Sequence, residues 1–214
     1  MIDVYDNVLE EHNAILIDDE VRKIHWKYDY HSHKGKINKH WHVFCGHNEE
    51  ECKKNVYPWA HTLFEAILGK YDFHKKYSVN GYERIYCNAH THGLEPHIHQ
   101  DDGNFTMIYY PRMDWEIEWG GGTAIFNEIK SANGSPDFKK EIKNIEIDKF
   151  VHYKGNRLVI FDAYLPHQAQ PVSRECYELR TCVVFKCVVD DGNRERLDFY
   201  KKNINEGNYK VEWR

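Results

Sequence analysis

The sequence of 214 residues lacks the features that mark several classes of protein. No apolar run approaches the roughly 20 residues that a membrane span needs. The first residues, MIDVYDNVLEEH, are acidic, whereas a secretory leader is basic and then apolar. No pattern recurs every 20 to 50 residues, as a solenoid or propeller would require. We therefore expect a soluble chain without a membrane partner.

The cysteines and the charge exclude further classes. There is no C-x-x-C pair, and a net charge of -5 without a basic stripe argues against a nucleic-acid partner. The cysteine pattern favours reduced thiols in a cytoplasmic protein over a disulfide framework. The six are Cys45, Cys52, Cys87, Cys176, Cys182 and Cys187.

The first third of the chain contains helical patterns. Residues 8–24 place Leu9, Leu16 and Ile24 roughly on one face. Apolar residues recur at intervals of three and four in 55–68, with Pro58 in the first turn and Gly69 as the predicted stop. The histidine-rich segment 31–50 has no regular apolar spacing, and we interpret it as a mobile loop or lid rather than a second metal site.

From residue 79 the pattern changes to short strands separated by turn residues. Helices followed by strands, without alternation, predict a mainly β (α+β) sandwich or barrel. We expect a single domain over 1–214, with helical support and the histidine-rich loop in 1–78, the β core in 79–189 and a peripheral tail in 190–214. The predicted strands cover 82–89, 105–110, 122–126, 144–150, 156–161 and 179–189, and 127–144 is a polar insertion.

The stretch PHIHQDDGNF (96–105) contains the pair His99 and Asp101. A chain with 15 His contains roughly one H-x-D triplet by chance, so the triplet alone is weak. On a strand, residues two apart point to the same side, so both side chains can reach one ion. A third ligand could come from His167, in the polar turn after an apolar strand. Two histidines and one carboxylate form the facial triad of non-haem Fe(II) sites.

The wider context then resembles a known family. Across roughly residues 80–188 the sequence is similar to the Fe(II)/2-oxoglutarate dioxygenases, and most similar to their prolyl 4-hydroxylase group. The resemblance implies a double-stranded β-helix (jelly-roll) core flanked by N-terminal helices. It is carried by the order of H-x-D at 99–101, I-Y-Y ending at Tyr110, Asp114-Trp115, Gly120-Gly121, the strand R-L-V-I-F, His167 with Gln170-Pro171, and Arg180 opening the last apolar strand.

The resemblance also implies roles. His99, Asp101 and His167 would hold Fe(II). Arg180 would bind the distal carboxylate of 2-oxoglutarate with help from the Tyr110 hydroxyl, because a guanidinium matches a carboxylate. The implied reaction consumes 2-oxoglutarate and O2, hydroxylates an aliphatic C–H and yields succinate and CO2, with ascorbate as a candidate reductant. The expected substrate is a prolyl residue in a peptide or protein, and free amino acids or other small molecules come next.

Several residues keep two interpretations. Tyr86 and Asn88 share one side of a predicted strand, either lining the co-substrate pocket or serving as core. Arg174 competes with Arg180 as the carboxylate anchor, and Arg180 could instead form an internal salt bridge. Asp102 is expected to be an outer carboxylate and not a ligand. The other histidines near the pair, His90, His92 and His97, are expected to line the pocket or to be solvated, and Gly120, Gly121 and Gly122 to form a bend.

Two rival functions remain open. A cupin-type metalloenzyme would use His97, His99 and His167 without 2-oxoglutarate. A non-catalytic jelly-roll binding module would merely pair His99 with Asp101. The chain also departs from the prolyl hydroxylases, which often carry Trp about six residues after the carboxylate-binding residue, where this chain has Lys186. Its interval from His167 to Arg180 is about four residues longer than is usual in that group.

Overall fold

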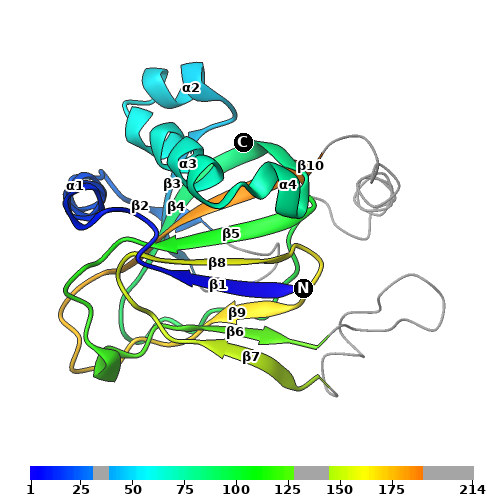
Figure 1. The fold of residues 1–214 in the computed structure, drawn as a ribbon. Coiled ribbons are helices and arrows are strands. Elements are labelled where there is room, and N and C mark those ends of the chain that lie inside the picture. The colour runs from blue at the N-terminus through cyan, green and yellow to red at the C-terminus, as the bar shows by residue number, and fades with distance from the viewer. Residues whose placement is uncertain (31–38, 128–144, 190–214) are drawn as a thin grey trace.

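Two antiparallel sheets form the core of the protein. The computed structural model describes residues 1–30, 39–127 and 145–189. The strands are β1 (Ile2–Asp6), β2 (Lys27–Tyr30), β3 (His40–Gly46), β4 (Val79–His90), β5 (Phe105–Tyr110), β6 (Thr123–Phe126), β7 (Ile147–Val151), β8 (Arg157–Asp162), β9 (His167–Ala169) and β10 (Arg180–Val189). The larger sheet has the order β1-β8-β5-β10-β4-β3-β2, and the smaller sheet, β7-β6-β9, lies beneath it in Figure 1. This layered arrangement confirms the predicted mainly β, jelly-roll core.

Helices cover the outer face of the larger sheet (Figure 1). They are α1 (Glu11–Arg22), α2 (Glu49–Lys54), α3 (Pro58–Tyr71) and α4 (Phe73–Tyr77), and a short 3-10 turn spans Ile117–Trp119. Pro58 occupies the first turn of α3, as predicted, because its missing N–H is not needed there. The predicted stop at Gly69 is wrong: α3 continues through it to Tyr71 and is capped by Asp72, whose backbone is left-handed.

The apolar face predicted for the first helix is also wrong. Leu9 and Ile24 lie outside α1, and Leu16 is 48% exposed. The buried face instead carries Ala14, Ile17 and Val21. Apolar residues occur on more than one side of this segment, so its periodicity alone could not decide which side packs against the sheet.

The loop predicted over 31–50 is wrong where the structure describes it, because His40–Gly46 forms β3 and Glu49–Lys54 forms α2. In β3 the small apolar residues Val43 and Cys45 face the core beneath the helices. Asn48 caps α2 by accepting a hydrogen bond from the Glu51 N–H. Residues 31–38 of that loop, 128–144 of the predicted insertion and the tail 190–214 lie outside the described residues.

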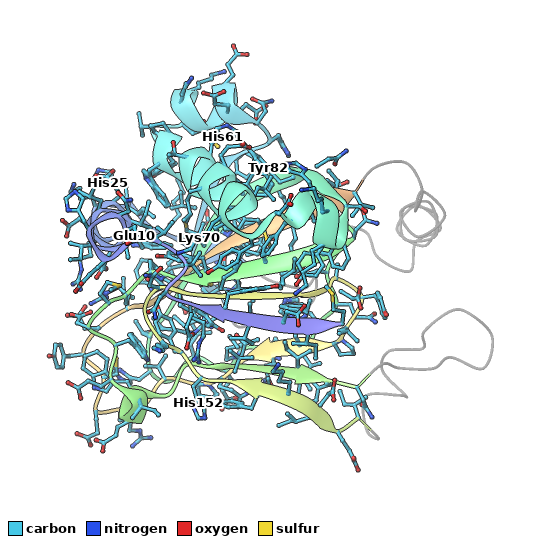
Figure 2. The ribbon with its side chains drawn as sticks, viewed as in Figure 1. Glu10, His25, His61, Lys70, Tyr82 and His152 are labelled. Carbon is cyan, nitrogen blue, oxygen red and sulfur yellow. The ribbon has the colours of Figure 1, made fainter. Side chains whose placement is uncertain are left out.

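Along the strands of the larger sheet, successive side chains alternate between two apolar clusters, as the two-residue period of a strand requires. In β10, Val183, Phe185 and Cys187 pack beneath the helices, whereas Cys182 and Val184 face the smaller sheet. In Figure 2, side chains fill the space between α3 and the sheet, where His61 bonds through Nδ1 to the Tyr82 hydroxyl at 2.9 Å. The site described below lies on the other face, between the sheets.

All six cysteines are buried and free, in agreement with the prediction of reduced thiols. Even the Cys45 and Cys87 sulfurs, 3.8 Å apart, are not bonded as a disulfide. The cytoplasmic location inferred from these thiols remains a prediction. In the described parts of the chain, every helix is too short or too polar to cross a membrane.

Candidate metal centre and co-substrate pocket

The structure brings together the three residues predicted to bind metal. The ligand atoms of His99, Asp101 and His167 all lie within 4.8 Å of one another. His99 does not lie on a regular strand with Asp101, as the sequence analysis assumed, but in the connection between β4 and β5. Two backbone hydrogen bonds, of 3.0 and 2.9 Å, pair His99 with His167 at the start of β9. A third, from the Asp101 N–H to the Ala163 carbonyl at 2.9 Å, fixes the carboxylate-bearing residue.

Both imidazole rings are oriented by backbone carbonyls. Nδ1 of His99 lies 2.9 Å from the His97 carbonyl, and Nδ1 of His167 lies 3.0 Å from the Leu165 carbonyl. A carbonyl oxygen only accepts, so each Nδ1 donates, which leaves Nε2 as the nitrogen that would bind a metal. The Nε2 atoms face Asp101, at 3.8 Å for His99 and 3.2 Å for His167. This donor set of two nitrogens and one oxygen, with ordered outer partners, fits non-haem Fe(II).

The local electrostatics favour the ligand forms of Asp101 and His99. Burial alone would raise the pKa of Asp101, but Lys186 and His167 hold it well below the ordinary value, so the carboxylate is ionised. Burial, aided by the nearby His167, lowers the pKa of His99 to about 3, so this imidazole is neutral. Thr106 donates a further hydrogen bond of 2.7 Å to Asp101 Oδ2.

The three residues line a cavity of about 60 Å³, and Arg180 lines it as well. The wall between them includes Thr123, Cys182 and Val184. Tyr86 and Asn88, for which the sequence left two interpretations, both line this cavity. The space is large enough for several waters, and charged side chains line it, so it is a pocket rather than a packing defect.

Arg180 is a buried cation, only 1% exposed. Its Nε donates to the Gly121 carbonyl at 2.5 Å, and Nη2 lies 3.5 Å from Thr123 Oγ1. Its guanidinium also lies 5.7 Å from the ring centre of Tyr110 and 5.8 Å from that of Tyr153. Among the residues that the structure describes, no carboxylate is within ion-pair distance, so the internal salt bridge considered from the sequence is not observed. A buried guanidinium in a pocket, with only neutral partners, is suited to binding an anion.

The predicted glycine bend explains how Arg180 fits. Gly120 and Gly121 have φ of +68° and +70°, a region that other residues adopt with strain. A Cβ on Gly121 would lie 3.1 Å from Cγ of Arg180. The bend therefore gives the guanidinium both the room and the carbonyl acceptor that it uses.

Tyr110 reaches the same region indirectly. Its fully buried hydroxyl bonds to Thr123 Oγ1 at 2.6 Å, and Arg180 approaches the same oxygen. Thr123, the first residue of β6, was not singled out from the sequence. The signal was its place directly after three glycines, which only the fold connects with Arg180.

The other candidates lie outside the group of three ligands. Asp102 forms a two-pronged ion pair with Arg84, at 2.7 and 2.6 Å, in agreement with an outer role. His90 and His97 line the cavity, but His97 is not in the three-residue group that can share an ion. Arg174, the competing anchor, is exposed in a turn.

Comparisons with known proteins extend these observations. No protein-family model matches the sequence, and no curated protein sequence is detectably similar to it. Solved structures do match. A prolyl-4-hydroxylase of Pseudomonas putida aligns with a TM-score of 0.55 at 14% identity, over 88% of this chain and 92% of that one.

Two further structures also match. The non-heme alpha-ketoglutarate-dependent carbocyclase SnoK from nogalamycin biosynthesis gives a TM-score of 0.61 at 11% identity, over 92% of this chain and 86% of that one. HygX from Streptomyces hygroscopicus, with nickel and 2-oxoglutarate bound, gives a TM-score of 0.58 at 9% identity, over 89% of this chain and 83% of that one. The chain thus has the jelly-roll fold shared by prolyl 4-hydroxylases and other 2-oxoglutarate-dependent oxygenases.

Proposed function

We propose that this protein is an Fe(II)- and 2-oxoglutarate-dependent dioxygenase that hydroxylates an aliphatic C–H. One observation carries the proposal: a triad of two histidines and one carboxylate shares a pocket with the buried Arg180, which has no carboxylate partner among the described residues. Bound Fe(II) would supply the oxidation in which 2-oxoglutarate and O2 become succinate and CO2 while the substrate C–H becomes C–OH. The proposal includes ascorbate as the reductant.

The chain's own residues perform the binding steps. His99, Asp101 and His167 hold the metal through two imidazole nitrogens and one carboxylate. Arg180 binds the distal carboxylate of 2-oxoglutarate, since charge-assisted hydrogen bonds from a guanidinium are about twice as strong as neutral ones. Thr123 and Tyr110 orient that guanidinium, and Tyr86 lines the space between. The apolar wall, which includes Val184, keeps water away from the co-substrate.

A prolyl residue in a peptide or protein is the substrate that we propose. The shared fold with a prolyl-4-hydroxylase supports this choice. Aromatic rings beside the pocket support it as well. The Tyr30 ring stacks on that of His42, with ring centres 4.0 Å apart, and lies edge-on to the pocket-lining His40, with ring centres 5.2 Å apart. Tyr30 is 40% exposed and offers an apolar ring surface to a substrate. Small molecules are the alternative, favoured by the same fold in a carbocyclase and by Lys186 in place of the usual Trp.

The test is succinate release from 2-oxoglutarate with added Fe(II), with and without proline-containing peptides. We expect turnover in the natural protein, none in Asp101→Ala, and a much raised 2-oxoglutarate requirement in Arg180→Ala. Matched controls are Asp102→Asn, which changes the neighbouring carboxylate, and Arg174→Ala, which removes the exposed competing anchor. Both controls should keep most of the turnover.

Each outcome has a clear meaning. Stimulation by proline peptides supports prolyl hydroxylation, whereas turnover without such stimulation directs the search to small molecules. If metal binds but no succinate forms under any condition, the proposal fails in favour of a cupin-type enzyme. If the protein binds no metal at all, the non-catalytic binding module remains.

A further inference from the structure

A row of three side chains crosses the larger sheet beside the metal ligands. The strand register places Lys186 of β10 opposite Thr106 of β5 on one side and opposite Arg84 of β4 on the other. Directly opposed residues lie on the same face of a sheet, so all three point toward the space between the sheets. Two carboxylates bind to this row. Asp102 pairs with Arg84, and Asp101 accepts a hydrogen bond from Thr106 and forms an ion pair with Lys186.

Lys186 is bound closely to the predicted metal ligand. Its side chain is 1% exposed, and its Nζ forms an ion pair with Oδ2 of Asp101. The same Nζ lies 3.3 Å from Thr106 Oγ1 and 5.7 Å from the ring centre of Tyr86. A buried ammonium is costly without an anionic partner, and Asp101 is the carboxylate within ion-pair distance in the described part of the chain.

The position of Lys186 along β10 separates its role from that of Arg180. Residues 180, 182, 184 and 186 face the same side of the strand, with the cations at the two ends and Cys182 and Val184 between them. Six residues of strand span about 20 Å, so one side chain is not a substitute for the other. Arg180 lies at the Gly121 bend, whereas Lys186 lies against the ligand itself.

We propose that Lys186 is a built-in competitor for the metal, which holds Asp101 in place in the metal-free protein and weakens metal binding. The inference rests on the proposed function, because it takes Asp101 as a ligand. A divalent cation and the ammonium would both bind the same carboxylate. In a buried site the repulsion between these two positive charges is weakly screened. The same lysine keeps the metal-free site assembled, because it neutralises a carboxylate that is otherwise buried beside two imidazoles.

Two effects of removing Lys186 oppose each other, and the structure indicates which is larger. Loss of the lysine would loosen Asp101 and weaken metal binding, but it would also remove a positive charge in contact with the ligand. Asp101 keeps two other restraints, the hydrogen bond of 2.7 Å from Thr106 and that of 2.9 Å from its own N–H to the Ala163 carbonyl. Orientation is therefore largely retained, and the loss of repulsion dominates.

The test compares Mn²⁺ affinity of metal-free proteins by calorimetry, without 2-oxoglutarate. We expect Lys186→Gln and Lys186→Met to bind Mn²⁺ about tenfold more tightly than the natural protein. Loss of an outer partner usually weakens metal binding by about tenfold or more, and here the sign is reversed because the partner is a cation that competes with the metal. Their metal-free forms should melt at lower temperature, and Mn²⁺ should raise their melting temperature by more. Equal or weaker Mn²⁺ binding in both variants would overturn the proposal.

Three controls separate charge from shape. Lys186→Arg keeps a cation and should stay close to the natural affinity. Thr106→Val removes a neutral donor from the same carboxylate oxygen and should not tighten binding. Lys23→Gln removes an exposed lysine on the surface and should leave the affinity unchanged. Tighter binding in Thr106→Val as well would contradict a role for the lysine charge.

A measurement on the natural protein covers the case in which the variants do not fold. The ¹⁵N ammonium resonance of Lys186 should shift when diamagnetic Zn²⁺ is added, and an unchanged resonance would overturn the proposal. Asp101→Ala distinguishes the two hypotheses. If the natural protein binds Mn²⁺ no better than Asp101→Ala, the proposed function fails along with this inference. If it binds better, but Lys186→Gln binds no more tightly than it does, only the role of Lys186 fails.

Discussion

The two faces of the larger sheet are built from the same strands but do different work. On the face beneath the helices, Val183 and Phe185 of β10 belong to an apolar cluster that reaches α3. On the opposite face, the intervening residues alternate with them and include Arg180 and Lys186, two buried cations within the same strand. The helix-covered face therefore stabilises the protein by apolar burial, whereas the opposite face carries buried charges, which cost stability, at the candidate site.

The largest expected effect comes from the helix-covered face. Phe185→Ala removes a fully buried ring and should lower the free energy of unfolding by about 3 to 5 kcal/mol, measured by urea denaturation. The fraction that remains folded should bind Mn²⁺ with unchanged affinity, because Phe185 points away from the ligands. A changed affinity would show that the two faces are not separable.

A smaller effect is expected at the glycine bend on the site face. Gly121→Ala places a Cβ at positive φ and close to Arg180, so it should cost about 1 to 2 kcal/mol of stability. It should also raise the 2-oxoglutarate requirement while leaving Mn²⁺ affinity alone, because it disturbs Arg180 and not the triad. Gly69→Ala, inside α3 with open space around it, is the control and should not reduce stability.

The site face should also respond to acid. Burial lowers the pKa of His90 well below the ordinary imidazole value, with Arg180 adding to the effect. The unfolded chain gains a proton near pH 6.5 and the folded chain does not, so stability is present above that pH and is lost as the pH falls. Between pH 7 and 5.5 the decrease in the free energy of unfolding should be about 1 kcal/mol smaller in His90→Gln than in the natural protein. His12→Gln, on the exposed side of α1, is the matched control. An equal loss in His90→Gln and the natural protein would refute this account.

The smallest effect is expected for an ion pair at the surface, in contrast to the buried Lys186–Asp101 pair. The hydrogen bond from Arg157 outweighs burial and, with Lys154, lowers the pKa of Asp6 to about 2. This contribution is present above about pH 4 and is lost as the pH falls toward 2. The Asp6 side chain is 36% exposed, so solvent screening limits the cost of Asp6→Asn at pH 7 to less than about 1 kcal/mol. Thermal melts at pH 7 and pH 3 would measure it, and a cost above 2 kcal/mol would contradict the screening argument.

The sequence alone determined which residues could carry the chemistry. The order of the H-x-D pair, the strands and His167 carried a family resemblance, which implied the jelly-roll core and a triad that the structure brings within 4.8 Å. Local patterns succeeded for the six strands predicted from 79 onward, because alternation and turn residues act over a few positions. They missed the short strand β9, since His167 was placed in a turn. They failed for α1 and β3, where the buried face depends on what packs against it.

Only the tertiary structure decided how these residues are held. His99 and His167 are 68 positions apart, yet two backbone hydrogen bonds pair them. The neutral surroundings of Arg180 and the contact of Lys186 with Asp101 likewise arise from register between strands distant in sequence. Residue types and short spacings are recorded in the chain itself, whereas register and burial follow from the free energy of packing the whole sheet, which no local pattern contains.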